Sequence, residues 1–179
     1  MRSLSANVFI FMQIREHSIL FQKDGVDEFA KDLVEDFGMV VTEITPDGAS
    51  AKDVESNDWK DEDGEDVYIP QRICLKKSSI SIKMALSGEH GSFYKKITPF
   101  LDYLTANTSN SENGLMLHSS YIGKGFANCC FNEMSTQDFY KSGTEEICEF
   151  TIKFDCYKPN KKVIYTYKPT SQKYILQVE

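Results

Sequence analysis

The residues with the clearest capacity for chemistry are carboxylates grouped between positions 58 and 66. The group comprises Asp58, Asp61, Glu62, Asp63, Glu65 and Asp66. An EF-hand loop with Gly64 at its sixth position would place Trp59 first and Pro70 twelfth, where calcium binding requires carboxylates. The cluster therefore predicts a solvated acidic loop. The alternative is low-affinity binding of a divalent cation, with Asp61, Asp63 and Asp66 as the candidate ligands.

Histidine and cysteine are the other residue types that could act as bases, nucleophiles or ligands. The histidines at positions 17, 90 and 118 carry no local signature. The cysteines lack CxxC spacing, and their odd number without a secretory signal favours a reduced compartment; they are Cys74, Cys129, Cys130, Cys148 and Cys156. Neighbours on a strand point to opposite faces, so a disulfide between Cys129 and Cys130 would be strained. Cys148 and Cys156 are predicted to be small buried apolar residues.

Three common catalytic and phosphate-binding motifs are missing from the sequence. It contains no GxSxG, no HExxH and no glycine-rich loop ending in GK[ST]. Gly123, Lys124 and Gly125 fit the turn of a β-hairpin better than a phosphate loop. We therefore predict no catalytic residue, no cofactor and no enzymatic activity.

Length and charge limit the class of protein further. The chain has 179 residues, of which 41% are hydrophobic and 26% charged, and this predicts one globular domain over residues 1–179. The longest apolar run is too short to span a membrane. Residues 1–70 hold six basic and seventeen acidic residues, a net charge of −11, whereas residues 71–179 carry +4. This distribution gives little support to nucleic-acid binding.

Hydrophobic periodicity predicts mostly strands. Apolar positions at spacings of three and four predict a helix over 26–37, and residues 47–66 are polar enough to form a long exposed loop. A second helix within 93–107 is expected to start near Thr98, which keeps Pro99 in its first turn. The expected strands cover 7–14, 18–22, 39–45, 67–75, 80–86, 115–121, 126–134 and 146–157, and a closing hairpin pairs 163–167 with 174–178 inside residues 161–179.

The predicted fold class is α+β or mainly β. Within the expected strand 146–157, residues 148–156 alternate strictly between apolar and polar side chains, which is typical of an antiparallel sheet with one wetted face. We therefore expect an antiparallel β-sandwich or split barrel with one or two flanking helices.

Residues 59–160 resemble the tube-type domain of phage tail proteins, and most closely the N-terminal domain of siphophage distal tail proteins. The resemblance lies in the order and character of five segments: WKDEDGEDVYIP, ICLKKSSISIKMALSG, ITPFLDYLTAN, GLMLHSSYIGKGFANCCF and EEICEFTIKFDCYKPN. It implies a β-sandwich or split barrel that assembles into a ring, usually a hexamer, between tail tube and baseplate. Many distal tail proteins carry a further C-terminal domain, so receptor or sugar binding is not carried over to this chain.

The resemblance also implies partners and a location. The expected partners are other copies of the chain and neighbouring tail proteins, with DNA only passing through the lumen and no membrane. The expected location is the virion tail of a phage or prophage, after synthesis in the bacterial cytoplasm. The alternatives are another tube-fold subunit, such as a tail-tube or tail-terminator protein, and a cytoplasmic module that binds a cation or ligand through the acidic loop.

Overall fold

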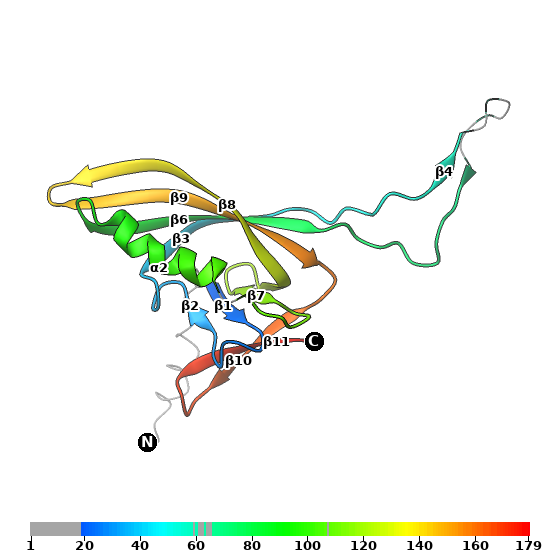
Figure 1. Cartoon of the computed structure of the whole chain (residues 1–179). Helices are drawn as coiled ribbons and strands as arrows, with labels where there is room; N and C mark the ends of the chain where they lie inside the picture. Colours follow the sequence, from blue (N-terminus) through cyan, green and yellow to red (C-terminus); the bar gives the residue numbers. More distant parts are fainter. Residues whose placement is uncertain (1–18, 59, 61–62, 64–65, 107) are drawn as a thin grey trace, which may run out of the picture.

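The computed structural model describes residues 19–58, 60, 63, 66–106 and 108–179. Its main element is a seven-stranded antiparallel sheet with the strand order β2-β1-β7-β8-β9-β6-β3 (Figure 1). These strands are β1 (Ile19–Lys23), β2 (Lys31–Asp32), β3 (Met39–Pro46), β6 (Ser78–Glu89), β7 (Leu115–Ser119), β8 (Lys124–Ser142) and β9 (Glu145–Lys158). The prediction of a mainly β, antiparallel fold is confirmed.

One helix, α2 (Phe93–Thr105), covers one face of this sheet (Figure 1). Its buried side chains Phe93, Ile97, Phe100 and Leu104 recur at spacings of three and four, so they share one stripe of the helix. They pack against the inward-facing residues of β6 and β9, which alternate along both strands. This contact forms the larger of the two hydrophobic clusters.

A two-stranded hairpin lies against the opposite side of the sheet. It pairs β10 (Val163–Lys168) with β11 (Lys173–Val178), as the sequence predicted. A second cluster joins this hairpin to the sheet through Leu20, Ala30, Met116, Ala127, Val163 and Leu176. Strands β1 and β7 are consequently buried along their whole length, which explains why neither shows a polar alternation.

The helix predicted over residues 26–37 is wrong. The segment contains turns and the short strand β2, which pairs with β1. Asp32 Oδ1 accepts hydrogen bonds from the backbone nitrogens of Val34 and Glu35 at 2.7 and 3.1 Å, and Asp27 Oδ2 accepts one from the nitrogen of Lys23 at 2.8 Å. Aspartate side chains thus satisfy the backbone locally in place of a helical ladder. The apolar residues that showed helical spacing lie in turns and in β2 instead.

The helix α2 starts five residues earlier than the predicted start near Thr98. Pro99 therefore lies inside the helix rather than in its first turn. The ring of Pro99 is exposed, while Phe93 and Ile97, which precede it, are buried. Burial of these two side chains outweighs the loss of one backbone hydrogen bond at the proline.

Other strand predictions have mixed outcomes. The strands expected at 18–22, 39–45, 80–86, 115–121 and 146–157 are found with modest changes of length, and the turn at Gly123 joins β7 to β8. The strand expected at 126–134 is much longer than predicted, because β8 runs for 19 residues and pairs with β9 as far as Ser142. The strand expected at 67–75 is wrong, because only Asp66–Val67 forms a strand there. The strand predicted at 7–14 lies outside the described residues. No helix in the described residues is long and apolar enough to cross a membrane.

Candidate functional site

The most distinctive feature of the molecule is an extended arm, residues 47–77, which connects β3 to β6. Figure 1 shows it projecting far beyond the sheet, in the direction away from the β10–β11 hairpin. Near its tip β4 (Ser56–Asn57) pairs with β5 (Asp66–Val67), and nearer its base Ala51 and Leu75 form an isolated bridge. The expected exposed loop at 47–66 is thus the outward part of a longer two-stranded arm.

The arm carries large apolar side chains that its own chain leaves exposed. Tyr68 and Ile69 are each 74% exposed and Ile73 is 57% exposed, and the others are Val54, Val67 and Leu75. Every described residue of the arm is exposed except the half-buried Pro70. Because a thin two-stranded ribbon has no interior, these side chains have nothing to pack against in the isolated chain.

The base of the arm is fixed to the sheet by the carboxylate of Asp155 on β9. Lys77 Nζ lies 2.8 Å from Asp155 Oδ2, and Ser79 Oγ donates to Asp155 Oδ1 at 2.9 Å. Asp155 is 8% exposed. The hydrogen bond from Lys77 is the largest cause that holds the pKa of this carboxyl below its usual value. The arm therefore leaves the sheet from an electrostatically anchored point.

The end of the arm is strongly acidic. Residues 53–66 hold eight aspartates and glutamates and a single lysine, Lys60. Residues 158–173, at the opposite end of the protein, hold five lysines and no acidic residue. The fold thus separates an acidic projection from the basic β10–β11 hairpin, a contrast that the division of the chain at residue 70 showed only coarsely.

The predicted cation ligands lie at the tip of this arm. Asp63 and Asp66 are exposed, and Asp61 lies outside the described residues. Among the residues that the structure describes, no three His, Cys, Asp or Glu side chains are grouped to hold a metal ion. Cation binding by Asp61, Asp63 and Asp66 stays a prediction.

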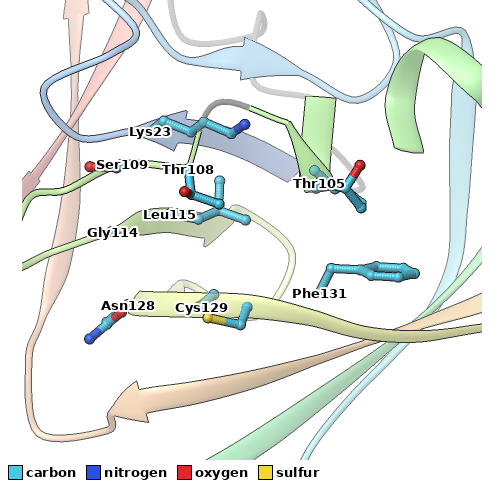
Figure 2. A pocket seen from close by; sticks show the side chains of 11 residues that line it. Lys23, Thr105, Thr108, Ser109, Gly114, Leu115, Asn128, Cys129 and Phe131 are labelled. Carbon is cyan, nitrogen blue, oxygen red and sulfur yellow. The ribbon is translucent and has the colours of Figure 1, made fainter. Parts of the chain in front are cut away.

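A cavity of about 280 Å³ lies beside the C-terminal end of α2 (Figure 2). Its wall includes Lys23, Leu115, Cys129 and Phe131. Lys23 Nζ donates to the backbone oxygen of Ala106, and burial lowers the pKa of the Lys23 ammonium group. With the lysine occupied in this way, the described lining residues place no base beside a nucleophile.

The histidines are separated in the structure as they are in the sequence. Nδ1 of His90 lies within hydrogen-bond distance of Glu146 Oε2, at 2.7 Å, beside a turn. His118 is buried on β7 against the ring of Tyr165, with a centroid separation of 4.7 Å. Burial lowers the pKa of His118 and favours its neutral form. His17 lies outside the described residues.

Two features of the structure could not be read from sequence spacing. The first is the arm's apolar surface, because residues 67–75 were interpreted as a strand leading into the sheet. The second is a contact between the thiols of Cys129 and Cys156, which are 27 residues apart and directly opposed on β8 and β9. Neither has a local signal, since both depend on which segments lie side by side.

Comparison with known proteins gives a likeness in structure rather than in sequence. No protein-family profile and no curated protein matches the chain. A solved structure that is similar is that of SPP1 Dit (gp 19.1), described as a paradigm of the hub adsorption apparatus in Gram-positive infecting phages. The TM-score is 0.52 at 15% identity, over 83% of this chain and 54% of that one, so the chain spans about half the length of that protein. The likeness confirms the expected distal-tail type of fold.

Proposed function

We propose that this protein is a structural component of a phage tail, which assembles into a ring that joins the tail tube to the distal tail or baseplate. The observation that carries the proposal is a distal-tail type of fold with a projecting arm whose apolar side chains are uncovered. A structural role accounts for both features without catalysis. The proposed location is the virion tail, with neighbouring tail proteins as further partners and DNA passing through the lumen.

The arm supports assembly on energetic grounds. Burial of apolar surface contributes roughly 25 cal/mol per Å², so covering side chains such as Tyr68 and Ile69 favours association. The arm also lacks a core of its own, so a partner surface would stabilise it. Both considerations favour a state in which the arm of one copy lies on another protein.

Charge supports a particular receiving surface on a second copy. The acidic arm tip complements Lys168 and Lys173 of the β10–β11 hairpin, which lies on a different part of the same chain. The other lysines of segment 158–173 are paired within the chain, Lys158 and Lys161 with Glu112 and Lys162 with Glu179. A contact between two different surfaces of identical copies is heterologous, and repetition by rotation closes it into a ring. We infer that the arm of each copy lies along the β10–β11 hairpin of the next, and that repetition of this one contact in six copies closes the ring.

Mass photometry or light scattering of the purified full chain tests the proposal. We expect a discrete oligomer of about six copies at micromolar concentration. The double variant Tyr68→Ser/Ile69→Ser should shift it to the monomer while the circular dichroism spectrum stays unchanged. The matched control Val40→Ser/Tyr94→Ser removes exposed apolar side chains from the body and should leave the oligomer intact.

The measured oligomeric state distinguishes the closed ring from the alternative hypotheses. A strict monomer for the unmodified chain contradicts self-assembly, and long filaments indicate a tail-tube subunit with an open repeat in place of a closed ring. Lys168→Glu/Lys173→Glu should weaken the oligomer and raised salt should weaken the unmodified one, because the proposed contact pairs lysines with acids. An unaffected oligomer in the lysine variant would place the arm on another surface.

A further inference from the structure

Cys129 and Cys156 face each other across the two central strands of the sheet. Their Sγ atoms are 3.2 Å apart, and the residues are directly opposed in the antiparallel register of β8 and β9. Their exposed fractions are 3% and 0%. Both are free thiols in this structure. The pair is therefore a buried dithiol whose partners are held in contact by the ladder between their strands.

The backbone geometry of this pair suits a disulfide. Directly opposed residues in antiparallel strands have Cα atoms about 4.5 to 5.5 Å apart, and disulfides span about 4.4 to 6.8 Å. The other cysteines are placed differently: Cys130 points to the exposed face, and Cys148 is opposed by Phe139. We propose that Cys129 and Cys156 are an oxidation site at which an intrachain disulfide forms and links β8 to β9.

The cavity beside α2 gives a route to the pair. Cys129 forms part of its wall, together with Leu104, Leu115 and Phe131 (Figure 2). A space of about 280 Å³ admits a small hydroperoxide such as hydrogen peroxide. The hydrogen bond with Cys156, and then burial, raise the pKa of the Cys129 thiol, so the reaction is slow at neutral pH and accelerates as the pH rises.

The reaction proceeds in two balanced steps. The Cys129 thiol loses its proton and attacks one peroxide oxygen, which breaks the O–O bond, gives a sulfenic acid at Cys129 and releases one water. The Cys156 sulfur then attacks the sulfenic sulfur, its proton leaves with the hydroxyl group as a second water, and the S–S bond forms. Two thiols are oxidised, and one peroxide is reduced to two waters.

The disulfide would stabilise the body of the protein independently of its proposed function. It closes a loop of 27 residues that contains the β8–β9 turn, and such closure restricts the unfolded chain. It would form after the chain leaves a reducing compartment, since glutathione and thioredoxin keep such thiols reduced. The folded protein thus carries a buried thiol pair that can form a crosslink when it meets an oxidant.

The test uses the full chain with the two exposed thiols removed, as Cys74→Ser/Cys130→Ser. The folded protein is treated with hydrogen peroxide, unfolded, alkylated and digested with trypsin. We expect a loss of about 2 Da in the intact mass and a crosslink between peptides 125–141 and 154–161, with Cys148 alkylated in peptide 142–153. The oxidised protein should melt several degrees higher than the reduced one.

Three variants in the same background decide the assignment. Cys148→Ser should retain the crosslink, whereas Cys129→Ser and Cys156→Ser should lose it. Because peptide mapping of the unsubstituted pair needs neither of the last two variants, a folding defect in them leaves the test intact. Full alkylation of Cys129 and Cys156 after oxidation overturns the proposal, as does a crosslink to Cys148 or conversion of both thiols to sulfonic acids.

Discussion

The side chain of Asp155 shows how one buried carboxylate can hold a long projection in place. It accepts hydrogen bonds from Lys77 and Ser79, which lie where the arm returns to the sheet. Sequence alternation placed residue 155 on the polar face of its strand, and this is correct. Asp155 is nevertheless buried, because the chain rejoins the sheet beside it at Lys77 and Ser79. The sequence did not indicate this contact.

Replacement of Asp155 by Asn should lower the free energy of unfolding by about 1–2 kcal/mol at pH 7. The pKa of the folded carboxyl is lowered, so its contribution is present above the unfolded pKa and is lost as the pH falls through the folded value, below 3.8. The difference between Asp155→Asn and the unmodified protein should therefore be constant from about pH 5 to 7 and shrink below about pH 4.

Urea unfolding at a series of pH values measures this difference. The exposed Asp47, also at the base of the arm, supplies the control Asp47→Asn, for which we expect little change at any pH. A gap between Asp155→Asn and the unmodified protein that widens on acidification would contradict the assigned direction of the pKa shift.

Gly125 lies where the sheet and the β10–β11 hairpin approach each other closely. A Cβ atom at this position would lie 2.6 Å from both Cβ and the backbone oxygen of Val163. Gly125→Ala should therefore destabilise the protein by about 1–3 kcal/mol, because the hairpin has to move away. Thermal or urea unfolding measures the loss. Gly48→Ala meets nothing within 4 Å and should be nearly neutral, so equal effects in the two variants would argue against this packing.

At the scale of elements, α2 shows tertiary burial overriding a local rule. Pro99 predicts a helix start, yet the helix begins at Phe93 because Phe93 and Ile97 are buried against the sheet. The segment at 26–37 shows the converse, because aspartate side chains satisfy its backbone in turns despite a helical spacing of apolar residues. In α2, burial of apolar side chains outweighed the proline signal. In residues 26–37, aspartate hydrogen bonds outweighed the helical spacing of apolar residues.

Pro99→Ala should stabilise the protein by about 1–3 kcal/mol, because alanine restores a backbone donor inside an intact helix. The ring of Pro99 is exposed, so its removal leaves no cavity. Differential scanning calorimetry should show a higher melting temperature. Pro169→Ala, in the β10–β11 turn, is the control and should give no gain. A lower melting temperature for Pro99→Ala would indicate that the proline supports the helix start.

At the scale of the whole molecule, the structure consists of a packed body and an arm that shares almost none of its contacts. The body and the arm differ in local stability, because the described residues of the arm make few backbone hydrogen bonds and none of them is buried. Limited proteolysis can detect this difference in local stability.

Within residues 19–179, brief trypsin treatment should cleave the arm first, after Lys52, Lys60 or Arg72, while the body stays folded. The two fragments should elute together on native chromatography, because β3 remains paired with β6. Cleavage should slow as protein concentration rises if the arm is covered by another copy. Mass spectrometry identifies the cuts. First cuts after Lys141 or Lys153, inside the β8–β9 hairpin, would contradict this order of stability.

The sequence by itself determined the features that depend on near neighbours. Alternation specified β6 and β9, Gly123 marked the β7–β8 turn, and a lack of apolar residues specified an exposed segment after residue 46. Gly125, expected in the same turn, lies in β8 and pairs with His118. Such patterns are readable because side-chain direction repeats every two residues along a strand. The same patterns also predicted the mainly β fold class.

Only the tertiary structure decided what distant segments do together. It turned residues 47–77 into an arm, buried both faces of β1 and β7, and brought Cys129 into contact with Cys156. The physical reason is that strand pairing and hairpin packing join residues far apart in the chain, and their burial energy outweighs local preference. The candidate interaction surface and the candidate oxidation site both arise from that level.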